Sequence, residues 1–305
     1  MKSIISSYLK DCPFGLGDFL RGSLALKHEC AARNLDFSLD FSDHEVGNYI
    51  KSREEVSFCK KRDTETFYMK FQELSDFLDN SDSDSVELCS NSFHGDSGDM
   101  NVNEAQLFFE SILEESVTSW FSDNIVFSDE VVNEFNKRTL INNLKDYEVI
   151  HFRVGDDYSF FDGKQGLYRS VPARKAPMFS EYFFETLFER VIKQNQFKDK
   201  NIVFMCDSEK VKNNVKDIIK KSEIKNCFVL SGSPCHTSSS MLLKRFTNPK
   251  VEPLLETFLD LYIISKADKV SSYCSYDFIS NFVRWPCLIY GVKLDGFSFY
   301  ELIKK

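Results

Sequence analysis

A group of polar residues directly follows an apolar stretch near the middle of the chain. His151, Arg153 and Asp156 belong to the sequence HFRVGD, which comes after the apolar residues 147–150. Ligands of open α/β sheets bind at the carboxyl ends of strands, and an arginine fork donates two parallel, charge-assisted hydrogen bonds to a phosphate. The sequence therefore predicts an anion site around Arg153. The alternative is a structural pair of Arg153 and Asp156 that closes a turn.

Two glycines and an aspartate stand between a strand predicted at 3–8 and a helix predicted at 19–33. Gly15, Gly17 and the adjacent Asp18 do not complete the fingerprint of a dinucleotide-binding loop, so an NAD site is not indicated. Glycines ahead of a helix still let a ligand approach the backbone. Asp18 has two interpretations: the N-cap of this helix, or a general base that faces a cleft between domains.

Two further strand ends carry polar side chains. Asp207 follows an apolar predicted strand, and its carboxylate either accepts the N–H donors of a guanine edge or caps the next helix. Ser272 and Ser275 lie where a strand predicted at 268–272 gives way to a helix predicted at 275–284. Hydroxyls and free backbone N–H groups at a helix start form an anion site, and ordinary capping by serine is the alternative.

The alternation of strands and helices predicts an α/β fold. Strands of the second half are predicted at 147–152, 201–206, 226–230, 268–272 and 287–291, and helices at 179–195, 208–221, 252–266 and 275–284. This order implies a parallel, doubly wound sheet. In the first half we predict strands at 3–8 and 36–41, helices at 19–33, 103–121 and 128–144, and an exposed loop at 75–103. Because 305 residues exceed the usual single core, we expect two domains, 1–145 and 146–305.

Charge and composition exclude several classes of function. Residues 1–145 hold 14 basic and 27 acidic side chains, whereas residues 146–305 hold 24 and 20. A polyanionic ligand is therefore expected in the second half, and general nucleic-acid binding is not. No stretch reaches the roughly 20 apolar residues of a membrane helix, although peripheral association with a membrane stays open. Nine scattered cysteines without a CxxC indicate reduced thiols and a cytoplasmic protein.

Motifs of other chemistries are missing from the sequence. There is no GxSxG, no Walker A loop and no HExxH. Asp82 and Asp84 form a DxD-like match, but they lie in a stretch rich in serine and aspartate that produces such matches by composition. We therefore expect neither a bound metal nor a cofactor.

The glycine loop, HFRVGD, the Asp207 strand end and the serine-rich turn occur in an order that resembles a known family. It is that of the GT-B glycosyltransferases of the fucosyltransferase superfamily, which includes α1,2- and α1,6-fucosyltransferases and protein O-fucosyltransferases. The sequence departs from the family pattern at Val154, where a second arginine is common, and at Asp18, where many members carry asparagine.

The resemblance implies a GT-B-like fold, in which two Rossmann-like α/β domains face each other across a cleft. It also implies an inverting, metal-independent transfer of a sugar, fucose from GDP-fucose, to a hydroxyl of a glycan acceptor. Matched residue by residue, the implied donor contacts are Gly15, Gly17, His151, Arg153, Asp207, Ser272 and Ser275. Arg153 would hold the β-phosphate, and Asp18 or Asp156 would be the base.

Two other functions stay open at this point. The chain could be a GT-B transferase that uses another nucleotide sugar, such as a UDP-sugar. It could also be a non-catalytic relative that binds a glycan or a nucleotide.

Overall fold

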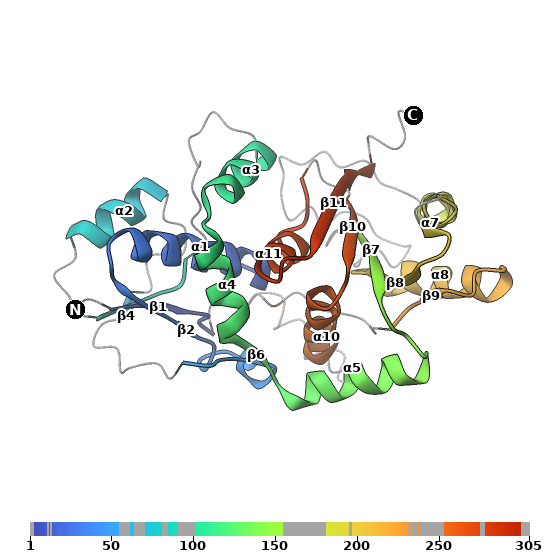
Figure 1. Cartoon of the computed structure of the whole chain (residues 1–305), viewed down its shortest axis with the longest axis horizontal. Helices are drawn as coiled ribbons and strands as arrows, with labels where there is room; N and C mark the ends of the chain where they lie inside the picture. The colour runs from blue at the N-terminus through green and yellow to red at the C-terminus, as the bar shows by residue number, and fades with distance from the viewer. Residues whose placement is uncertain are drawn as a thin grey trace, which may run out of the picture.

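The chain folds into two parallel β-sheets with helices packed around them (Figure 1). The computed structural model describes residues 3–10, 12, 14–54, 62–63, 71–80, 85–90, 102–154, 181–194, 197–230, 232, 237, 253–274 and 278–299. The first sheet belongs to the N-terminal half of the chain and the second sheet to the C-terminal half, as the colours of Figure 1 show. Helix α5 (Asp129–Ile141) leads from the first half to the second.

The first sheet has the strand order β2-β1-β5-β4, and every pair in it is parallel. Its strands are β1 (Ser3–Ser7), β2 (Asp36–Asp40), β4 (Arg62–Asp63) and β5 (Ser85–Leu88). Helix α1 (Leu16–Ala32) joins β1 to β2. This confirms the α/β unit predicted from the strand, glycine loop, helix and strand at the start of the sequence.

The second sheet has the order β11-β10-β7-β8-β9 and is also parallel throughout. Its strands are β7 (Tyr147–Arg153), β8 (Asn201–Cys206), β9 (Cys227–Phe228), β10 (Lys269–Cys274) and β11 (Lys293–Ser298). The helices of this half are α7 (Glu181–Ile192), α8 (Glu209–Lys221), α10 (Pro253–Ser265) and α11 (Asn281–Ile289). All residues of β7 except Arg153 are buried, as expected for the central strand of a sheet covered on both faces.

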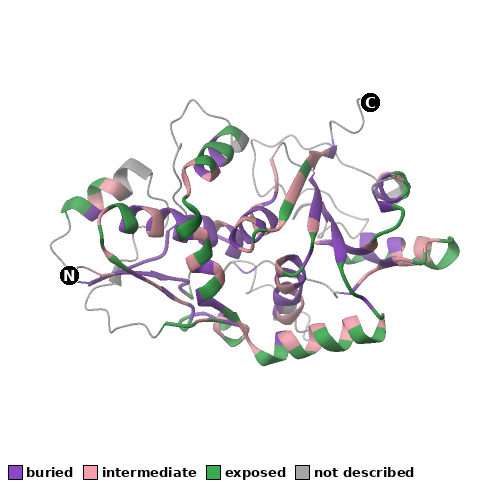
Figure 2. Cartoon of the chain, viewed as in Figure 1, coloured by how far each residue is buried: buried purple, intermediate pink, exposed green. Residues whose placement is uncertain are grey.

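Smaller elements complete the first half. A two-stranded antiparallel sheet pairs β3 (Ile50–Ser52) with β6 (Ile125–Phe127), and a 3₁₀ helix, η1 (Glu45–Asn48), precedes it. The helices are α2 (Phe71–Asn80), α3 (Val102–Ile112) and α4 (Glu115–Asn124). Figure 2 shows β7, β8, β10 and α11 largely buried, whereas β11 is only partly buried and α5 is exposed along much of its length.

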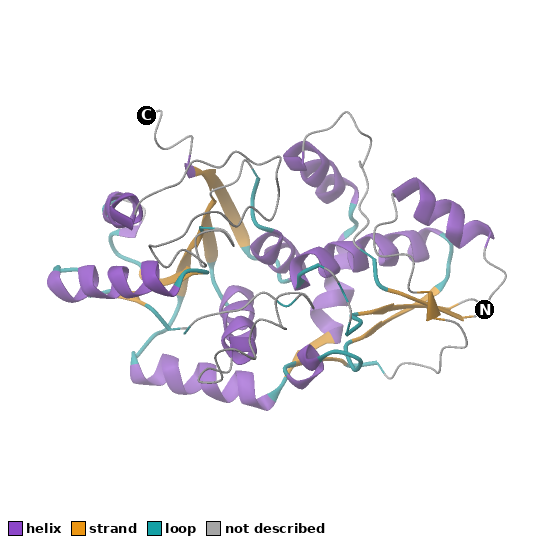
Figure 3. Ribbon diagram, turned by 180° about the vertical axis from the view of Figure 1, so that it is seen from behind, coloured by secondary structure: helices purple, strands orange, loops and turns teal. Residues whose placement is uncertain are grey.

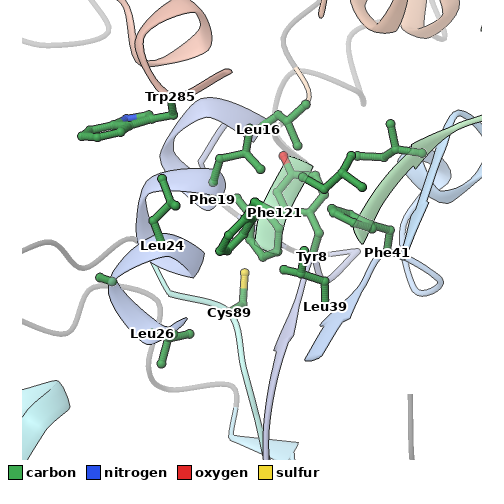
Figure 4. Packing of buried hydrophobic residues seen from close by; sticks show 14 of the residues in the cluster. Tyr8, Leu16, Phe19, Leu24, Leu26, Leu39, Phe41, Cys89, Phe121 and Trp285 are labelled. Atoms are coloured by element: carbon green, nitrogen blue, oxygen red, sulfur yellow. The ribbon is translucent and has the colours of Figure 1, made fainter. Parts of the chain in front are cut away.

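The core of the first half includes side chains from the C-terminal end of the chain. Trp285 of α11 and Phe258 of α10 are fully buried in the same cluster as Phe19 and Phe121. Figure 4 shows Trp285 next to the residues of α1 in this cluster. Burial of each large apolar side chain contributes about 1.5–3 kcal/mol. The contact of α10 and α11 with the first half is therefore a major source of stability, and the division of the chain at residue 145 stays a prediction.

One wrong prediction concerns residues 75–103. The expected exposed loop at 75–103 contains the end of α2 and the buried strand β5, which pairs with β1 inside the sheet. Two of the four residues of β5 are polar although all four are buried, so the continuous apolar run that usually marks a buried parallel strand is missing.

The last helix and strand were also misplaced. The apolar residues 287–291, predicted as a strand, belong to the end of α11 and its turn, because an apolar run alone does not distinguish a buried helix from a strand. The helix ends before Gly291, whose φ of +65° lies in the left-handed region that favours glycine. The edge strand β11 follows it. No helix in the described ranges is long and apolar enough to cross a membrane.

Candidate functional site

Three strands of the second sheet bring the predicted polar residues to one edge. Strands β10, β7 and β8 are neighbours and run parallel, so their carboxyl ends meet. In this register Ser272 is opposite His151, and Cys274 is opposite Arg153. His151 and Arg153 are two residues apart on one strand and therefore share a face of the sheet. The structure thus gathers three of the predicted site residues at the edge where α/β sheets bind ligands.

An ion pair fixes the arginine at this edge. Nη1 of Arg153 donates to Oδ2 of Asp207 at 2.6 Å, and the backbone N–H of Val154 donates to Oδ1 at 2.8 Å. The side chains of Arg153 and Asp207 are 20% and 15% exposed, so the pair is screened only in part from solvent. Asp207 does not cap α8, because Ser208 is the N-cap. The partner expected for Arg153 in a structural pair, Asp156, lies outside the described residues.

His151 is a buried, neutral imidazole. Nδ1 lies 3.0 Å from the hydroxyl of Ser272. Burial lowers the pKa of His151 to about 4; the Asp207 carboxylate acts in the opposite direction and Arg153 in the same direction. At neutral pH the imidazole therefore has one N–H, which acts as a donor, and one nitrogen that accepts.

The structure corrects the position of the predicted serine site. Ser272 lies within β10 and is fully buried, not at the start of a helix. The next helix, α11, begins at Asn281, six residues after the predicted start. Ser275 lies outside the described residues, so its predicted contact with phosphate stays a prediction.

The glycine loop of the first half packs against the second half. Gly15 is the N-cap of α1, and it has no side chain that could accept a hydrogen bond from the first N–H groups of the helix. The hydroxyl of Thr237 accepts one of them, from Leu16, at 2.8 Å, and it also accepts the Tyr8 hydroxyl at 2.8 Å. A Cβ built on Gly17 would lie 2.5 Å from the backbone nitrogen of Phe282. Gly17 therefore allows the first turn of α11 to approach α1, and the two helices lie side by side (Figure 3).

Asp18 reaches across to the second half through the same contact. Oδ1 of Asp18 accepts a hydrogen bond from Nδ2 of Asn281 at 2.6 Å, and Arg21 lies 3.7 Å from the same oxygen. Oδ1 of Asn281 accepts from Gln106 and from Trp285, which fixes the direction of the amide. Asp18 is not the N-cap of α1, so that interpretation is wrong. It lies in the first turn, where the helix dipole favours a carboxylate.

The start of α11 connects Asp18 with the strand edge. The backbone of Ser280 lies close to the thiol of Cys274, the residue opposite Arg153 in the register. Asn281 follows Ser280 and holds Asp18. Asp18 and Arg153, on different halves of the chain, are therefore linked by one short chain of contacts. Asn281 and Thr237, which make the links between halves, were not singled out by the sequence analysis.

No metal centre is visible in the part of the chain that the structure describes. Within it, no three histidine, cysteine or carboxylate side chains come together in a group that could hold an ion. The DxD-like pair of Asp82 and Asp84 lies outside the described residues.

Known proteins were compared with the chain by sequence and by structure. No family model and no curated protein matches it. A NodZ alpha-1,6-fucosyltransferase soaked with GDP-fucose matches with a TM-score of 0.52 at 11% identity, over 94% of this chain and 92% of that one. The fucosyltransferase NodZ from Bradyrhizobium gives 0.51 at 10% identity, over 94% and 93%. A mutant of Arabidopsis thaliana FUT1 in complex with GDP gives 0.55 at 9% identity, over 97% and 70%.

At these identities the similarity shows the fold. It extends over nearly the whole of this chain, including both sheets. The predicted α/β, GT-B-like class is therefore confirmed: the chain has the fold of these fucosyltransferases.

Proposed function

We propose that the chain is an inverting, metal-independent fucosyltransferase. It would move fucose from GDP-fucose to a hydroxyl of a glycan acceptor. The observation that carries the proposal is the Arg153–Asp207 pair beside His151 at the carboxyl edge of the second sheet. The fold supports it, since the two structures described above as soaked with GDP-fucose and in complex with GDP share it.

In this proposal Arg153 binds the β-phosphate of the donor. Departure of GDP builds negative charge on that phosphate, and a fixed guanidinium stabilises this charge without reorganisation. Asp207 serves the donor site by holding the guanidinium in place. A direct contact between Asp207 and the guanine base is the alternative role of this carboxylate.

The base in this proposal is Asp18, with Asp156 as the alternative. The acceptor oxygen forms a bond to the anomeric carbon while the bond from that carbon to the β-phosphate oxygen breaks. The electron pair of that bond leaves with GDP, and the acceptor proton passes to the carboxylate of Asp18. Attack on the face opposite the diphosphate inverts the anomeric centre. Asp18 suits this face because it belongs to the first half, whereas Arg153 belongs to the second.

We further propose two domains divided near residue 145, with the donor bound mostly by residues 146–305. Gly15 and Gly17 would border the donor from the first half, and Ser275 would contact a phosphate.

The seven cysteines in the described ranges are free and buried, which supports a reducing, cytoplasmic location.

A panel of nucleotides and one turnover assay test this function. Thermal melting with GDP, UDP, CMP and ADP at millimolar concentration should give the largest stabilisation with GDP, because stabilisation grows as RT ln(1 + [L]/Kd). Transfer from GDP-fucose to an array of immobilised oligosaccharides should persist in EDTA. A preference for UDP would favour a UDP-sugar transferase, and GDP binding without transfer to any glycan would favour a non-catalytic relative. Loss of transfer in EDTA, restored by Mn²⁺, would instead point to Asp82 and Asp84 as metal ligands.

A further inference from the structure

The hydroxyl of Ser272 is fully buried and faces the imidazole of His151. The two residues are opposite each other on the adjacent strands β10 and β7, and Oγ lies 3.0 Å from Nδ1. A side chain with no exposed surface is not placed to touch a ligand itself. Its effect on a ligand must therefore pass through His151.

A short chain of hydrogen bonds decides which nitrogen of His151 carries the proton. Oγ of Ser272 also lies 3.5 Å from the thiol of Cys274, and either atom could be the donor. The Cys274 thiol is buried, and Ser272 is its hydrogen-bond partner among the described residues.

One arrangement of hydrogens gives the thiol and the hydroxyl an acceptor each and leaves only the Nε2 hydrogen of His151 for a ligand. The thiol of Cys274 donates to Oγ of Ser272, the Ser272 hydroxyl donates to Nδ1 of His151, and the imidazole proton is on Nε2. In the reverse arrangement Nδ1–H donates to Ser272 and Ser272 donates to Cys274. The buried thiol hydrogen then has no acceptor among these three side chains. Buried polar groups are usually satisfied, so the first arrangement is favoured.

We propose that Ser272 is a positioning residue that holds His151 in the Nε2–H tautomer, so that the imidazole presents a neutral N–H donor to the diphosphate of the nucleotide sugar. The inference rests on the proposed function for the identity of the ligand. His151 shares its face of the sheet with Arg153, so a phosphate oxygen bound by the guanidinium lies on the side that the imidazole faces. The opposite tautomer would direct a lone pair at an anion.

The neighbouring serine provides a matched control. Ser271 is buried like Ser272, lies on the same strand and points to the opposite face of the sheet. Its hydroxyl has no hydrogen-bond partner among the described residues. Ser271→Ala therefore removes the same atom from the same strand without touching the His151 contact.

Nitrogen-15 NMR of protein labelled at histidine reads the tautomer without any ligand. His151→Asn identifies the signal, because only five histidines are present. We expect the Nε2–H tautomer in the wild-type protein and in Ser271→Ala, and a mixture of tautomers in Ser272→Ala. Ser272→Thr, which keeps a hydroxyl, should restore the wild-type signal. A wild-type Nδ1–H tautomer, or an unchanged signal in Ser272→Ala, would overturn the inference.

Titration with GDP then tests the role of the tautomer. Ser272→Ala should bind GDP about fivefold to tenfold more weakly, the size expected for one hydrogen bond, and Ser271→Ala should bind as the wild type does. A changed tautomer with unchanged affinity would overturn the role toward the donor. Wild-type protein that binds no GDP would refute the proposed function, while the NMR signal still decides the contact between Ser272 and His151.

Discussion

Arg153 and Asp207 form an ion pair at 2.6 Å across the carboxyl ends of β7 and β8, and the backbone N–H of Val154 donates to the second oxygen of the same carboxylate. The carboxylate thus holds both the guanidinium and the backbone beside it. An arginine fixed in this way can meet a developing negative charge without first changing its conformation.

The variant Asp207→Asn tests what this carboxylate does. An amide has one oxygen, so either Arg153 or Val154 would face an NH₂ group, and we expect the free energy of unfolding to fall by about 1–3 kcal/mol. If Asp207 acts only by holding Arg153, the ratio of the affinities for GDP and inorganic pyrophosphate should not change. Calorimetric titration with both ligands measures the ratio. A loss of affinity for GDP alone would show that Asp207 contacts the guanine.

Asp18→Asn tests the proposed base. The amide keeps an oxygen for the Asn281 contact and nearly the same volume, but it cannot take a proton. We expect fucose transfer to fall by about 10²-fold or more, with little change in GDP affinity or in the melting temperature. Normal transfer by Asp18→Asn, together with lost transfer by Asp156→Asn that still binds GDP, would assign the base to Asp156.

Gly17→Ala tests the contact between α1 and α11. The added Cβ would lie 2.5 Å from the Phe282 nitrogen and 2.6 Å from the Asn281 carbonyl carbon, both of which are backbone atoms. The helices must therefore move apart, and overpacking of this kind typically costs about 1–3 kcal/mol. Urea unfolding of the variant should show this loss. An unchanged unfolding midpoint would mean that the two helices are not in close contact in solution.

The pH dependence of stability tests the environment of His151. Its pKa is lowered from 6.5 to about 4 in the folded chain, so between these values the unfolded chain binds more protons. The contribution to stability is therefore complete above pH 6.5 and is lost as the pH falls toward 4, by about 3 kcal/mol at most. Urea unfolding of wild type and His151→Asn between pH 4 and 7 separates the contribution of His151 to stability from that of other groups. Parallel curves for the two proteins would contradict a buried, neutral His151.

The sequence predicted the parts of the site that depend on local pattern. Arg153 and Asp207 follow apolar runs that become β7 and β8, and the carboxyl ends of parallel strands necessarily meet. The role of Ser272 was not predictable in this way, because β10 continues two residues beyond the expected end and places the hydroxyl inside the sheet.

Contacts between distant parts of the chain left no local signal. Asp18 and Asn281 are 263 positions apart, and Tyr8 and Thr237 are 229 apart. Their hydrogen bonds depend on the packing of α11 against α1, which follows from the burial of Trp285 in the first core and not from any motif. The order of the motifs predicted the fold, whereas the junction between the two halves required the structure.

Arg153 is proposed to bind the diphosphate of a guanine nucleotide, and calorimetric titration with GDP tests this role most directly. The wild-type chain should bind GDP, and Arg153→Ala should bind it about 10- to 100-fold more weakly, since a hydrogen bond to a charged group contributes about 1.5–3 kcal/mol. Arg153→Lys, which keeps the charge without the fork, separates charge from geometry, and Arg190→Ala, at an exposed arginine of α7, serves as the control. Equal GDP affinity in wild type and in folded Arg153→Ala would contradict this role of Arg153.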